Sequence, residues 1–172
     1  VIQTDTEMGV VIDMTDVLKG DAVSAQRTVK LVDKKDLVVS DRVVAPEDKN
    51  VTYTWRMTGS GEPEITNDGI VLTANGKTMY LKAEGNVEFE YCTWSAEPKM
   101  DYDDPNEGKY TVGIIAEIPS GKIADFKVVL SPDEKKFIEY HEKDISLFST
   151  LFDGGDFLQQ AGKYGRIDRP RF

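Results

Sequence analysis

Apolar and polar residues alternate along much of this chain, most clearly between Val51 and Thr58. Val51, Tyr53, Trp55 and Met57 are apolar, and the residues between them are polar. A period of two is typical of a β-strand with one buried face and one exposed face. The pattern recurs from about residue 10 to residue 130. It predicts an all-β protein, an antiparallel β-sandwich of about 9–11 strands.

The register of one hairpin follows from its apolar residues. The apolar sets on either side of residues 33–35 are odd-numbered, so a three-residue loop places both sets on one face and pairs Val29 with Val39. The same register pairs Arg27 with Asp41, which lie in phase with the apolar residues. A buried arginine needs such a partner, so the register predicts a structural ion pair, with substrate binding as the alternative role.

A second hairpin is predicted by its turn. Asn75–Gly76 is the favoured dipeptide for a type I′ turn, because both central residues need a positive φ. That turn places Leu72 opposite Met79 and Ile70 opposite Leu81, and all four are apolar.

The alternation stops at Pro132. Residues 133–143 are rich in charge and favour a short helix, and the apolar residues in 147–152 have helical spacing. We therefore expect a β-sandwich domain over residues 1–132. We expect residues 133–172 to form a C-terminal extension with a short helical tail, packed on the sandwich or on a missing partner domain.

The charge balance limits the partners. The chain has 172 residues with 21 Lys and Arg and 31 Asp and Glu, and its formal net charge is −10. Such a surface repels polyanions, so nucleic acid and sulfated glycans are poor partners for the surface as a whole. No run of about 20 apolar residues is present, so no membrane span is expected.

Two groups of residues are candidates for binding. Trp94 and Tyr91 are the aromatic candidates for stacking on a sugar ring, with Trp94 out of phase with Tyr91 and the better exposed of the two. Asp101, Asp103 and Asp104 concentrate carboxylates in one loop and offer oxygens to a structural calcium ion, although the spacing is not that of an EF-hand and turn chemistry explains it equally. No other cofactor is expected.

Catalytic groups are not indicated. The single cysteine, Cys92, has no base nearby in the sequence, and the only histidine, His141, lies in a charged segment typical of a solvated helix face. Pairs of carboxylates arise freely among 31 acidic residues, so they do not by themselves indicate a glycosidase.

Five sequence motifs follow one another between residues 8 and 132: Val23–Leu31 with its in-phase arginine, Val38–Val43, Thr52–Arg56, Asp101–Gly108 and Val128–Pro132. In this order they resemble the C-terminal β-rich region of heparinase II/III-like proteins.

This resemblance implies a polysaccharide lyase, which cleaves uronic-acid-containing glycans by β-elimination. It also implies a bacterial protein of the periplasm or the extracellular space. In such a lyase the chemistry lies mainly in a helical toroid that precedes the β-rich region. The tyrosine and histidines of that chemistry have no matching positions here, so no catalytic residue is assigned.

The resemblance favours a non-catalytic β-sandwich module. Its partners would be the N-terminal helical catalytic domain of the same polypeptide and a polysaccharide substrate. The alternatives are an autonomous carbohydrate-binding module, a self-sufficient enzyme, and a packing or adhesion module without a small ligand.

Overall fold

The structure is a computed structural model that describes residues 1–98, 100, 102 and 105–134. This part of the chain consists of strands and loops and contains no helix. The strands are β1 (Ile2–Gln3), β2 (Glu7–Asp13), β3 (Ser24–Val32), β4 (Asp36–Val44), β5 (Val51–Gly59), β6 (Glu62–Thr66), β7 (Gly69–Ala74), β8 (Lys77–Gly85), β9 (Phe89–Ser95), β10 (Tyr110–Ile118) and β11 (Ile123–Ser131).

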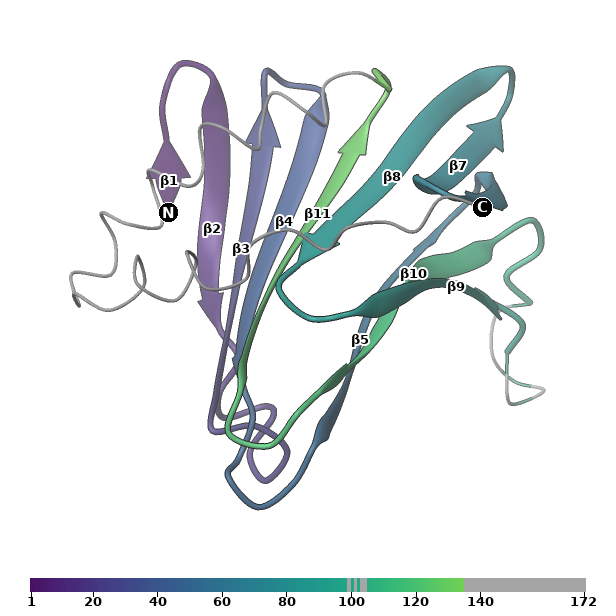
Figure 1. The fold of residues 1–172 in the computed structure, drawn as a ribbon. Coiled ribbons are helices and arrows are strands. Elements are labelled where there is room, and N and C mark those ends of the chain that lie inside the picture. The colour runs from purple at the N-terminus through teal and green to yellow at the C-terminus, as the bar shows by residue number, and fades with distance from the viewer. Residues whose placement is uncertain (99, 101, 103–104, 135–172) are drawn as a thin grey trace, which may run out of the picture. The chain divides into compact units, whose positions relative to one another are not determined.

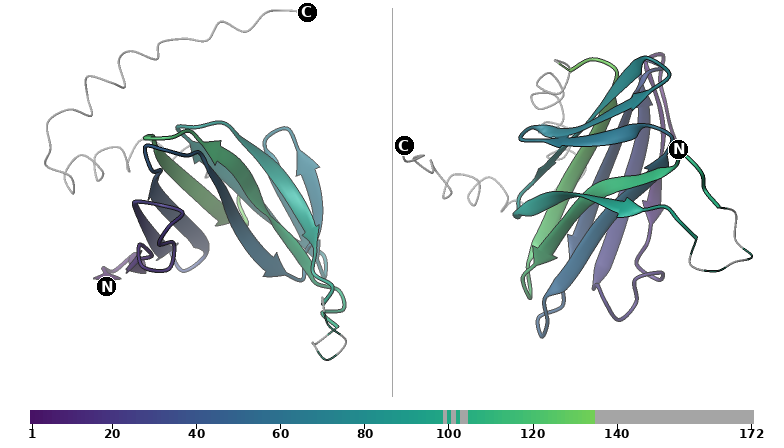
Figure 2. Two further views of the ribbon diagram at one scale, coloured as in Figure 1. Left: turned by 90° about the horizontal axis from the view of Figure 1, so that it is seen from below. Right: turned by 90° about the vertical axis from the view of Figure 1, so that its right-hand side faces the viewer.

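The strands form two antiparallel sheets of unequal width. The larger sheet has eight strands in the order β1-β2-β3-β4-β11-β8-β7-β6, and the smaller has three in the order β5-β10-β9. In Figure 1, β1, β2 and β3 of the larger sheet lie on the left, and the strands of the smaller sheet lie on the lower right. Figure 2 shows the two layers from two further directions. The predicted all-β sandwich is confirmed.

Both predicted hairpin registers are confirmed. The β3–β4 hairpin pairs Val29 with Val39 and turns through residues 33–35. The β7–β8 hairpin pairs Leu72 with Met79 and Ile70 with Leu81. Its turn residues have φ values of 51° at position 75 and 70° at position 76, as a type I′ turn requires.

The hydrophobic core lies between the two sheets. Its buried members come from both: Ala25, Val39, Val43, Ile70, Leu72, Leu81, Ala83, Ala124, Phe126, Val128 and Leu130 from the larger sheet, and Tyr53, Trp55, Val112, Ile114, Ala116 and Ile118 from the smaller. The rings of Tyr53 and Phe126 stack across the interface, with centroids 4.5 Å apart and planes 5° apart. Strand β5 therefore lies over β11.

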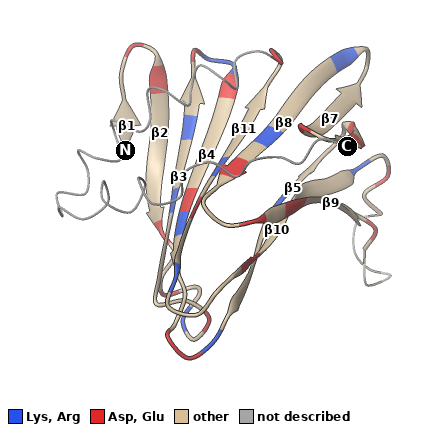
Figure 3. Ribbon diagram, viewed as in Figure 1, with Lys and Arg blue, Asp and Glu red and all other residues tan. Residues whose placement is uncertain are grey.

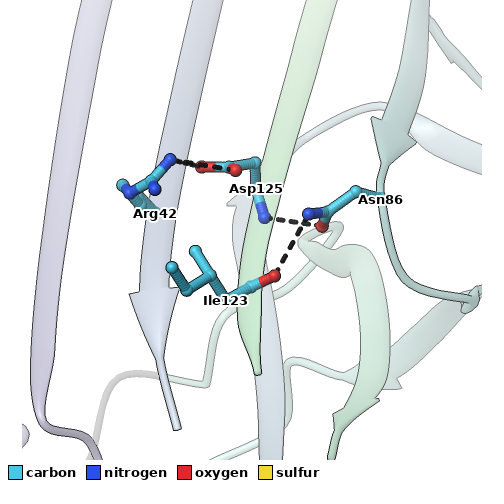
Figure 4. A network of polar contacts seen from close by, with 4 residues as sticks. All are labelled: Arg42, Asn86, Ile123 and Asp125. Atoms are coloured by element: carbon cyan, nitrogen blue, oxygen red, sulfur yellow. Dashed lines mark hydrogen bonds and ion pairs between the residues drawn. The ribbon is translucent and has the colours of Figure 1, made fainter. Parts of the chain in front are cut away.

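Asn86 fixes the passage from β8 in the larger sheet to β9 in the smaller one. Its side chain donates to the carbonyl of Ile123 at 3.1 Å and accepts from the backbone N–H of Asp125 at 2.8 Å (Figure 4). The carboxylate of Asp125 in turn pairs with Arg42 at 2.9 Å. Burial raises the pKa of Asp125, and Arg42 opposes that rise. The network holds the β8–β9 crossover against the start of β11.

Several predictions fall outside the described residues. The predicted helical extension covers residues 133–172, of which 135–172 lie outside the described residues, and the predicted domain boundary at residue 132 stays a prediction. In the part of the chain that the structure describes, no helix has the length and apolar character that a membrane crossing requires.

Gly113 is the position in the smaller sheet where a side chain fits least well. A Cβ built there would overlap the backbone carbonyl of Trp55 on β5. We therefore expect Gly113→Ala to lower the free energy of unfolding by about 1–3 kcal/mol, because either β10 or β5 must shift. Gly59→Ala is the matched control, since the same construction at Gly59 meets nothing within 4 Å. Equal urea midpoints for the two variants would contradict the prediction.

Candidate functional site

The most concentrated polar group in the core joins three strands. Arg27 on β3 donates two hydrogen bonds to the carboxylate of Asp41 on β4, from Nε at 2.7 Å and from Nη2 at 2.6 Å. The hydroxyl of Tyr53 on β5 donates to the same carboxylate. The side chain of Asp41 is only 2% exposed and that of Arg27 is 29% exposed. The register therefore brings together the predicted pair and adds a tyrosine from the opposite sheet.

The electrostatics of this cluster favour a structural role. Burial raises the pKa of Tyr53 well above its ordinary value, and the negative charge of Asp41 adds to that rise. The hydrogen bond to Asp41 raises the pKa of Arg27. Tyr53 thus stays protonated as a donor, and the bidentate arginine balances the buried carboxylate. A tyrosine acting as a general base would need the opposite shift.

Sequence reasoning missed Tyr53 as the third member. Its position in the apolar phase of β5 indicates only a core aromatic residue. Nothing in the local sequence says which strand of the other sheet its hydroxyl meets. That contact depends on how the two sheets are placed on each other.

Trp94 lies on the outer face of the smaller sheet. The guanidinium carbon of Arg56 on β5 lies 4.4 Å from the centre of the Trp94 ring on β9. Strand β10 runs between them, and Gly113 pairs with Arg56 on one side and with Cys92 on the other. The missing side chain at Gly113 leaves room for the arginine to reach the indole. The result is a cation–π pair on a solvent-facing sheet.

The structure does not bring Tyr91 and Trp94 to one surface. Tyr91 packs against the core and accepts a hydrogen bond at its hydroxyl from the backbone N–H of Ala83 at 2.8 Å. Burial raises its pKa. Positions 91 and 94 are an odd number of residues apart, so a regular strand directs them to opposite faces.

An acidic hollow lies on the outer side of the smaller sheet. Its volume is about 640 Å³, and its polar lining is Thr52, Glu88, Glu90 and Glu117. Sequence reasoning did not single these glutamates out, because they come from β10, β9 and the turn before β9. Three carboxylates around one hollow disfavour an anionic sugar there.

The remaining candidates give no described site. Asp101, Asp103 and Asp104, the proposed calcium ligands, and His141 all lie outside the described residues. Among the described residues, no group of three or more His, Cys, Asp or Glu side chains is placed to hold a metal ion. Figure 3 shows Lys and Arg interspersed with Asp and Glu along the strands of the larger sheet.

The Arg27–Asp41 pair provides a stability test. We expect Arg27→Ala to lower the free energy of unfolding by about 3–5 kcal/mol, because Asp41 is left buried and charged. Arg42→Ala is the matched control: its partner Asp125 has a side chain that is 27% exposed, so the expected loss is about 1 kcal/mol or less. Both values are measured by chemical denaturation. If Arg27→Ala lowers the free energy of unfolding by no more than the control does, the prediction that the pair stabilises the fold is contradicted.

Sequence comparison identifies no relative. No protein-family model matches the chain, and no curated protein matches its sequence significantly.

Solved structures share the fold. The chain is similar to the heparan sulfate lyase HepC from Pedobacter heparinus, with a TM-score of 0.51, 11% identity, and coverage of 76% of this chain and 20% of that one. It is similar to heparinase III, with a TM-score of 0.55, 15% identity, and coverage of 75% and 20%. A heparinase III with methylated lysines gives a TM-score of 0.53, 16% identity, and coverage of 77% and 20%.

The chain thus spans about a fifth of the length of the structures it matches. The resemblance to heparinase II/III-like lyases that the strand motifs predicted is confirmed at the level of the fold.

Proposed function

We propose that this chain is a non-catalytic β-sandwich module of a heparinase II/III-like polysaccharide lyase. The main observation that supports this proposal is the fold shared with three lyase structures, each about five times as long as the matched region. The module would support an N-terminal helical catalytic domain of the same polypeptide. It would help to form the wall of the cleft in which a uronic-acid-containing glycan undergoes β-elimination.

The polar cluster of the core supports a structural role for the module. β-Elimination needs a base for the C5 proton and an acid for the leaving oxygen, both in contact with the sugar. Tyr53 and Asp41 are buried and bonded to each other, with Arg27 bonded to the same carboxylate. Their hydrogen bonds connect the two sheets to each other.

The charge of the chain bears on the substrate. A net charge of −10 repels a heavily sulfated glycan. A less charged uronate polymer is therefore the substrate class we propose for the parent lyase. The proposed localisation is the bacterial periplasm or the extracellular space, where the enzyme would encounter such polymers.

The module hypothesis predicts that the chain alone has no lyase activity. Purified chain mixed with uronate polymers should produce no rise in the ultraviolet absorbance of the unsaturated uronate product. The longer polypeptide that contains this chain should produce that rise on at least one of the same polymers. Product formed by the isolated chain would contradict the proposal, and so would a longer polypeptide inactive on every uronate polymer tested.

A second candidate function is autonomous carbohydrate binding, favoured by the Arg56–Trp94 pair. The indole offers an apolar ring to a sugar, and the guanidinium offers a charge-assisted hydrogen bond to a uronate carboxylate. The neighbouring hydroxyls of Thr58 and Thr111, 2.9 Å apart, add polar groups on the same outer face.

The binding function is tested by Trp94→Ala. If this surface binds uronate oligosaccharides, the substitution should weaken binding about tenfold or more in titration calorimetry. Thr93→Ala is the matched control, because Thr93 is the adjacent residue on the opposite face of β9. No binding by the unmodified chain, or equal binding by both variants, would rule this function out.

A further inference from the structure

The inner face of the larger sheet is apolar well beyond the area that the smaller sheet covers. Residues paired across antiparallel strands lie on one face, so Val10, Val29, Val39 and Val128 form one apolar row over β2, β3, β4 and β11. The row is buried at Val39 and Val128, but Val10 is 39% exposed.

On β2 this open area continues above and below that row. Met8 is 56% exposed and Ile12 is 41% exposed. Their partners on β3 are Leu31 and Arg27, which are only partly buried. We name the apolar inner-face positions of β2 and β3 the apolar floor: Met8, Val10, Ile12, Val29 and Leu31.

A free strand edge stands beside the apolar floor. Tyr53 on β5 contacts Asp41 on β4 and stacks on Phe126 on β11, so β3 and β2 extend past β5. Among the described strands, β5 pairs only with β10, so no described strand pairs with its other edge over Val51–Gly59. This edge is nine residues long, contains no proline and is rich in β-branched and aromatic residues. Natural proteins cover or interrupt such edges because they recruit further strands.

We infer that two β-strands from the rest of a longer lyase polypeptide extend the smaller sheet at β5 and cover the apolar floor. This rests on the proposed function, which supplies that polypeptide. The floor is two strands wide, or about 10 Å, which is the width of one hairpin. The added strands alternate apolar and polar residues, with the apolar ones facing Val10, Ile12 and Val29. They continue the interface that already joins β5 to β4 and β11.

A second copy of this chain fits the same place poorly. Pairing β5 with β5 of another copy about a twofold axis would set the two smaller sheets side by side in one layer. The larger sheets would then lie in a common layer too. Each of them extends past its own β5 by β3, β2 and β1, so they would overlap. The open edge therefore favours strands that bring no such extension.

Hydrogen exchange tests the inference directly. Amides of Val51–Gly59 and Val10–Ile12 are compared between the isolated chain and the longer polypeptide that contains it. We expect protection of alternate β5 amides and of β2 to rise about tenfold or more in the longer polypeptide. Unchanged exchange in a longer polypeptide that does cleave uronate polymers overturns the inference and leaves the proposed function standing. Increased protection in a longer polypeptide that cleaves no uronate polymer supports the inference and contradicts the proposed function.

Substitutions on the two faces of β2 give a second readout. Ile12→Ser alters the apolar floor, and Val11→Ser alters the opposite face at a similar exposure of 45%. Both should melt close to the unmodified chain when made in the isolated chain. In the longer polypeptide only Ile12→Ser should lower the melting temperature, and equal shifts would contradict the inference. A dimer of the isolated chain that Ile12→Ser converts to monomer in sedimentation would identify a second copy as the occupant and also overturn it.

Discussion

The joint between the two sheets depends on one buried carboxylate. Asp41 lies in the apolar phase of β4, where an unpaired charge would be strongly destabilising. Arg27 from the neighbouring strand supplies the balancing charge, and Tyr53 from the other sheet supplies a further donor. Because the partners come from β3 and β5, the carboxylate constrains both the register of one hairpin and the placement of the smaller sheet. Stacking of Tyr53 on Phe126 ties the same point to β11.

The unequal width of the sheets is the feature that links the fold to the proposed function. Three strands face eight, and the apolar inner face of the larger sheet continues under no described strand at β2 and β3. An isolated domain gains little from exposing Met8, Val10 and Ile12. The same exposure is consistent with the proposed role as a module of a larger enzyme. The lyase structures that share the fold are about five times as long as the matched region.

The two candidate binding features lie on different surfaces and have different chemistry. The Arg56–Trp94 pair is on the outer face of the smaller sheet and suits a polar, anionic sugar. The apolar floor is on the inner face of the larger sheet and suits another layer of protein. The acidic hollow near Glu88 and Glu117 does not help to distinguish the two roles. Its carboxylates limit where an anionic glycan can lie. The proposed binding surface and the proposed packing surface thus belong to different sheets.

The sequence alone determined the strands, two hairpin registers and the Arg27–Asp41 pairing, because alternation and turn chemistry act between residues close along the chain. The opposite orientations of Tyr91 and Trp94 follow from the same alternation. Only the tertiary structure decided that Tyr53 meets Asp41, that Arg56 covers Trp94 and that β5 leaves β2 and β3 uncovered. These contacts depend on strand order and on how one sheet lies over the other. Such non-local placement is set by packing of the whole core, and no local pattern encodes it.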